Sequence, residues 1–159
     1  MLFHRINRTN PEKVYVIVKN SYSTADASAG QVYAWDYVTD KDGISVTKPS
    51  GVLRSVPAGV AIAAIASGDY GLLQVWGHNT NVKCKAGSGL LSSKISAGSL
   101  VYIKTSGFEM YSRQLIASSA SITIEDFAGI AGVAGSPTNT AAKFTSATTW
   151  VGTVFIKCL

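Results

Sequence analysis

The most informative segment of this chain is Ala58-Gly59-Val60-Ala61-Ile62-Ala63-Ala64-Ile65-Ala66-Ser67-Gly68-Asp69-Tyr70-Gly71-Leu72-Leu73-Gln74-Val75-Trp76-Gly77. Two apolar runs flank the short piece Gly68-Asp69-Tyr70-Gly71. This pattern predicts a buried β-hairpin, with strands over residues 60–66 and 72–76 and a structural turn between them. The alanines also permit a short helix over residues 60–66, but Gly59 and Gly68 bound that run at the length of a strand. We expect Gly68 and Gly71 where a Cβ atom is costly, through a positive φ or a close approach.

Other segments rich in β-branched and aromatic residues predict further strands. They cover residues 13–19, 31–38, 44–47, 79–85, 100–105, 107–112, 121–125, 130–133 and 150–158. No segment has the pattern of a long amphipathic helix, and at most one helical turn is expected near Glu125-Asp126-Phe127. The sequence therefore predicts an all-β fold. One compact domain, a barrel or a sandwich, covers residues 13–159 and follows an irregular N-terminal arm over residues 1–12.

A short pattern recurs within the chain. Ala58-Gly59-Val60-Ala61, followed by the apolar residues 71–76, resembles Ala128-Gly129-Ile130-Ala131, followed by residues 152–156. Two similar hairpins packed in one barrel or sandwich would produce this recurrence. Chance would produce it as well in a chain rich in glycine and alanine.

The composition indicates a surface that is poor in charge. Of the 159 residues 47% are hydrophobic and 14% are charged, whereas about 25% charged residues is usual. Serine, threonine, glycine and alanine take the place of charged residues, and such short side chains lose little conformational entropy when a partner covers them. This favours a chain that packs against neighbours. A small structural or extracellular β-protein with an ordinary polar surface is the alternative.

The net charge of +5 is distributed unevenly. The first nineteen residues contain one acidic side chain, Glu12, and four basic ones, Arg5, Arg8, Lys13 and Lys19. A basic arm suits nucleic acid, a membrane surface or an acidic protein face. Because a groove that follows phosphates interleaves basic residues with aromatic ones, these thinly spread charges favour a solvated arm or one that lies on a partner protein. We expect no direct binding of nucleic acid.

The cysteine content and the lengths of the apolar runs indicate in which cellular compartment the chain is expected. Cys84 and Cys158 are too few for a disulfide framework and have no metal-ligand spacing. Two free, buried thiols in a reducing compartment are favoured, and a single bridge between them stays open. The N-terminus lacks the apolar core of a signal peptide, and the longest apolar run, over residues 60–66, is short for a membrane span. We expect synthesis in a cytoplasm and no membrane partner.

The residue types that usually act in catalysis do not form a recognisable active-site or metal-binding motif in this sequence. His4 and His78 have no metal-ligand partners at a suitable spacing, and Ser67 lacks the pattern of a nucleophile elbow. Asp40-Lys41-Asp42-Gly43 lacks the later ligands of a calcium loop and is expected to form a turn. We therefore expect no enzyme, no cofactor and no metal ion.

Three aromatic residues alternate along one predicted strand. Tyr33, Trp35 and Tyr37 lie two residues apart, so they share one strand face. Such a face could stack on sugars or bases. A core face or a subunit interface has the same pattern and is the more frequent explanation in a β-domain.

Three parts of the chain resemble a family of tailed-phage virion proteins, the small head-decoration or cement proteins. The first is Val60-Ala61…Ala64…Gly68-Asp69-Tyr70-Gly71-Leu72-Leu73-Gln74-Val75-Trp76-Gly77, which is similar to the central motif of the family. The second is Ala97-Gly98-Ser99-Leu100-Val101, where Ser99 replaces an expected acidic residue. The third is Ala128-Gly129-Ile130-Ala131 with the final strand over residues 152–156. The resemblance covers about residues 50–159, and the first fifty residues match no family.

The resemblance implies a β-barrel or β-tulip-like core, oligomers that are often trimers, and no catalysis. It further implies a structural virion protein, made in the host bacterial cytoplasm, that binds the outside of the capsid and has the major capsid protein as its partner. On this interpretation Arg5, Arg8 and Lys13 contact the capsid, and Tyr33, Trp35, Tyr37 and Trp150 are candidates for an oligomer interface. The competing hypothesis is a receptor- or carbohydrate-binding β-module that uses Tyr33, Trp35 and Tyr37.

Overall fold

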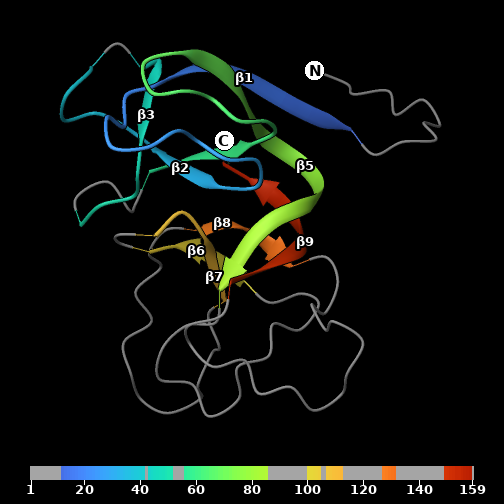
Figure 1. Ribbon diagram of the computed structural model, residues 1–159. Coiled ribbons are helices and arrows are strands. Elements are labelled where there is room, and N and C mark those ends of the chain that lie inside the picture. Colours follow the sequence, from blue (N-terminus) through green and yellow to red (C-terminus); the bar gives the residue numbers. More distant parts are fainter. Residues whose placement is uncertain are drawn as a thin grey trace.

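The computed structural model describes residues 12–41, 43–51, 56–85, 100–104, 107–112, 127–131 and 149–158. Within these ranges the chain forms nine strands and no helix, and all nine strands belong to one mixed sheet (Figure 1). The strands are β1 (Lys13–Asn20), β2 (Val32–Trp35), β3 (Ser45–Thr47), β4 (Pro57–Ala61), β5 (Tyr70–Lys85), β6 (Leu100–Ile103), β7 (Met110–Ser112), β8 (Phe127–Ala131) and β9 (Thr149–Lys157). The prediction of an all-β fold is confirmed.

The strand pairings form two closed circuits that share β5. The first circuit runs β1-β3-β2-β4-β5 and closes because β5 also pairs with β1. The second runs β5-β7-β6-β8-β9 and closes because β9 pairs back with β5. Figure 1 shows β1, β2 and β3 above, β6, β7 and β8 below, and the long strand β5 passing through both parts. Each circuit closes its own sheet as a small barrel does, which leaves few strand edges open.

The two circuits repeat one order of strand pairings, and parts of the register recur. Val60 and Ala61 of β4 pair with Gln74 and Leu73 of β5, and Ile130 and Ala131 of β8 pair in the same way with Phe155 and Val154 of β9. An irregularity in register follows the pairs Tyr33–Gly59 and Val101–Gly129 at the same place in both circuits. Val18–Gly71 and Val82–Gly152 correspond as well. The recurrence in the sequence is therefore a structural repeat, because chance would not reproduce both register and irregularity.

The predicted hairpin is present, but its first strand is shorter than expected. β4 ends at Ala61, and residues 62–69 form a loop that turns inward instead of continuing the strand to residue 66. In this loop Ile65 pairs with Ala27 through an isolated antiparallel bridge, and the Ile65 side chain is buried in the core of the first circuit. The apolar run therefore forms a strand followed by an exposed loop, in which Ile65 is the residue whose side chain is buried.

The other predicted strands differ from the observed strands mainly in where they end. β2 stops at Trp35 instead of residue 38, because Asp36 accepts hydrogen bonds from the Ser21 hydroxyl (2.9 Å) and the Thr39 N–H (2.9 Å) and starts a turn. The strands predicted over residues 72–76 and 79–85 are one continuous strand, β5. The strand predicted over residues 121–125 lies outside the described residues, as do residues 1–11 of the predicted arm.

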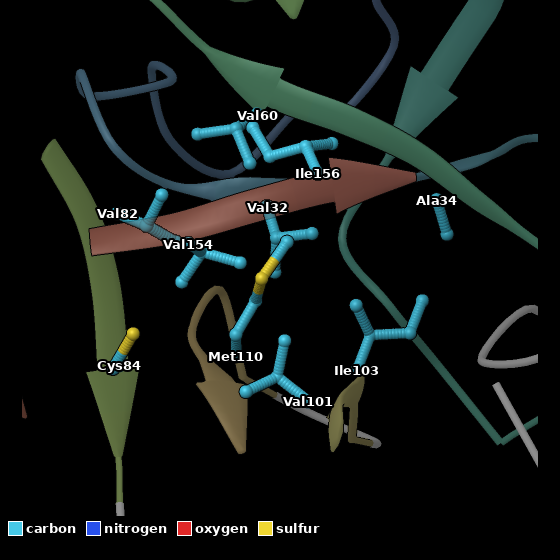
Figure 2. Packing of buried hydrophobic residues seen from close by; sticks show 10 residues of the cluster. All are labelled: Val32, Ala34, Val60, Val82, Cys84, Val101, Ile103, Met110, Val154 and Ile156. Atoms are coloured by element: carbon cyan, nitrogen blue, oxygen red, sulfur yellow. The ribbon is translucent and has the colours of Figure 1, made fainter. Parts of the chain in front are cut away.

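Two apolar clusters fill the circuits. The first consists of Val18, Ala27, Tyr33, Val46, Ala58, Ala61, Ile65 and Leu73. The second gathers Val82, Cys84, Val101, Ile103, Met110, Val154 and Ile156, and it also takes in Val32, Ala34 and Val60 from the opposite faces of β2 and β4 (Figure 2). Because those three side chains belong to the first circuit but are buried with the second, the two halves are expected to fold together.

The shared strand changes direction near its middle. Gly77 has φ +98°, and a Cβ atom there would overlap the backbone carbonyl oxygen of Glu12. The buried Gln74 amide donates to the carbonyl oxygens of Trp76 (3.1 Å) and His78 (3.3 Å) and accepts from Asn79 Nδ2 (3.0 Å). These bonds satisfy polar groups where the regular ladder is interrupted.

Candidate interaction surface

Gly68 lies in the turn before β5 and Gly71 is the second residue of β5, and each position has a separate reason to be glycine. Gly68 has φ +85° with open space around it, so it is needed for its backbone conformation. Gly71 has no positive φ, but a Cβ atom there would overlap the side chain of Ile65. Tyr70 lies between them and is 65% exposed.

A buried asparagine holds this turn against β1. The backbone N–H of Asn20 donates to the carbonyl oxygen of Asp69 (2.9 Å), and the Gly68 N–H donates to the carbonyl oxygen of Asn20 (2.7 Å). Asn20 Nδ2 donates to the Ile65 carbonyl oxygen (3.1 Å), and Oδ1 accepts from the Tyr22 N–H (3.1 Å). The exposed Tyr70 is therefore held on a rigid scaffold. Sequence reasoning missed Asn20, because a polar residue at the end of a strand is typical of the surface.

An apolar surface covers the outside of β1 and the adjoining part of β5. Ile17 of β1 pairs directly with Leu72 of β5, and the Ile62 N–H donates to the Leu72 carbonyl oxygen (3.3 Å). The exposed fractions of these side chains are large, at 65% for Ile17, 41% for Ile62 and 40% for Leu72. We call Tyr15, Ile17, Ile62, Tyr70 and Leu72 the outer apolar face. Exposed apolar side chains that gather on adjacent strands mark an interaction site more often than scattered ones do.

The structural repeat differs in part at this face. Ile17 pairs with Leu72 in the first circuit, whereas the corresponding part of the second circuit has an irregularity in register between Asn79 and Val82. The next pair, Lys19–Tyr70, corresponds to Lys83–Val151, and the side chains of Tyr70 and Val151 are 65% and 59% exposed. Both circuits thus place an exposed apolar side chain at this position of the repeat.

β1 also presents an open backbone edge. Lys19 pairs with Ser45 of β3 on one side and with Tyr70 of β5 on the other, so β3 and β5 lie along opposite edges of β1. Along the β3 side the described pairings involve only Lys19 and Asn20. Residues 13–18 thus have no strand partner on that side within the described part of the chain, and among them Val14, Tyr15 and Ile17 are exposed.

The stacking face considered for Tyr33, Trp35 and Tyr37 does not form, and Tyr33 is a core residue instead. Tyr33 is fully buried in the core of the first circuit, where its ring lies 5.2 Å from that of Phe108, and burial raises the pKa of its hydroxyl. Trp35 is half-buried and packs against the same core. Tyr37 follows the end of β2 in a turn and is 49% exposed. Tyr33 is therefore unavailable to a sugar or to another subunit, which corrects both uses proposed for the three residues together.

The remaining candidates are placed as follows. Lys13 is exposed at the first position of β1 and so belongs to the sheet, whereas Arg5 and Arg8 lie outside the described residues. Trp150 lies in β9 opposite Cys84. Neither Cys84 nor Cys158 is in a disulfide, and burial raises the pKa of each thiol to about 12. The described residues contain no cluster of side chains suited to a metal ion and no helix that could span a membrane.

Comparison of the chain with protein-family models, with curated proteins and with solved structures finds no match.

Proposed function

We propose that this chain is a structural virion protein that binds the outside of a tailed-phage capsid and stabilises it as a decoration protein. The observation that carries the proposal is the outer apolar face, which lies on a closed β-scaffold and includes Tyr70 of the motif that resembles the decoration family. The role is one of binding and not of catalysis. The site of action is the capsid exterior.

The physical requirements of such a protein agree with this structure. A cement protein needs a rigid body, and two circuits with a shared strand supply one. It also needs a surface that adheres without strong charge, and the outer apolar face has that character. Because a capsid repeats its binding site many times, modest single contacts add up through effective concentration when the decorating copies also contact one another.

The proposed partners are the major capsid protein and further copies of this chain, with a trimer as the expected assembly. Arg5 and Arg8 would reach an acidic capsid face beside Lys13, which is exposed at the start of β1. Attraction between opposite charges accelerates the encounter and orients the partners. The carbohydrate-binding alternative required Tyr33 at the surface, and Tyr33 is buried.

Sedimentation with purified, expanded heads of the phage that encodes the chain tests this function. We expect the intact protein to pellet with heads, and a protein lacking residues 1–11 to remain folded but to pellet much less, since an arm adds little to a core. Leu72→Lys should also reduce pelleting, whereas Val38→Lys, at an exposed turn residue, should not. Failure of the intact protein to pellet with heads would overturn the proposal, and unchanged pelleting of the arm-deleted protein would overturn the role of the arm.

A further inference from the structure

We draw no further inference here: the strongest candidate, the side-chain cluster around the buried Tyr111 of the second circuit, where Lys104 Nζ lies 5.5 Å from the centre of the ring, also includes the carboxylate of Glu109, and nothing in the described residues shows what would cover a cluster with charges of both signs.

Discussion

The position of the loop over residues 62–69 is determined by three residues, Asn20, Ile65 and Gly71. Asn20 supplies hydrogen bonds to this loop, Ile65 fills the core, and Gly71 leaves the space that Ile65 occupies. The sequence was sufficient to predict that Gly68 and Gly71 were both required as glycine. It could not show that Ile65 was the reason for Gly71, because an isoleucine in an apolar run is equally suited to a strand or to a loop that buries one side chain.

Gly71→Val should destabilise the fold by about 1–3 kcal/mol, because the added side chain would overpack the core against Ile65. Chemical denaturation measures the change. The control is Gly51→Ala, since a Cβ atom at Gly51 meets nothing within 4 Å. In an Ile65→Ala background the same Gly71→Val substitution should cost much less. An equal cost in both backgrounds would show that contact with Ile65 is not the cause.

The buried thiol of Cys84 predicts a loss of stability in alkaline solution. Burial raises the pKa of Cys84 from 9.0 to about 12. Below pH 9 this thiol keeps its proton in both the folded and unfolded states, so the free energy of unfolding does not depend on it. Between pH 9 and 12 the unfolded chain binds fewer protons than the folded one, so stability falls as pH rises, by up to about 1.4 kcal/mol per pH unit.

Cys84→Ala should therefore flatten the alkaline part of the stability profile. The measurement is the free energy of unfolding in urea at pH 8 and at pH 10, with reductant present. We expect a smaller loss over this interval in the variant than in the unaltered chain, by about 1 kcal/mol. Identical slopes in the two proteins would contradict the protonated, buried state of Cys84.

At the scale of elements, local patterns predicted where strands occur better than where they end. The segments that became β1, β3, β6 and β9 were each identified within a few residues. β5 was predicted as two strands, because Gly77 resembles a turn residue in the sequence. In the structure the Gln74 and Asn79 side chains supply hydrogen bonds at this bend, so the strand continues. Whether side chains form such hydrogen bonds depends on the folded structure, so the local sequence pattern does not predict that the strand continues.

Gly77→Ala should destabilise both circuits at once. The substitution forces an alanine into φ +98° and against the carbonyl oxygen of Glu12, at a cost of about 2–4 kcal/mol. Because β5 belongs to both circuits, tryptophan fluorescence and hydrogen exchange in the second circuit should report one common, lowered transition. Gly68→Ala serves as the comparison, since Gly68 has a positive φ but open space, and it should cost only about 1 kcal/mol. Loss of the first circuit alone would contradict a shared folding unit.

For the whole molecule, the recurrence in the sequence was open to two explanations, related hairpins or chance, and the structure shows the related pairings and how they are joined. One strand ends the first circuit and begins the second, and side chains of β2 and β4 are buried with the second core. This connection could not be predicted, since it depends on pairings between residues far apart in the sequence. It also leaves the outer surfaces of the two halves free to differ in sequence.

The low content of charged residues predicts self-association. The structure reduces the candidate surfaces for it from two to one. Residues 31–38 were one candidate, but their central part is buried, so the final strand β9 remains, with Val151 59% exposed. We expect light scattering at micromolar concentration to report a closed oligomer, a trimer, because closed symmetry buries such a surface without open-ended growth. Val151→Lys should lower the measured mass, and Val38→Lys should not. A protein that stays monomeric in solution and also binds heads as separate copies would contradict the prediction.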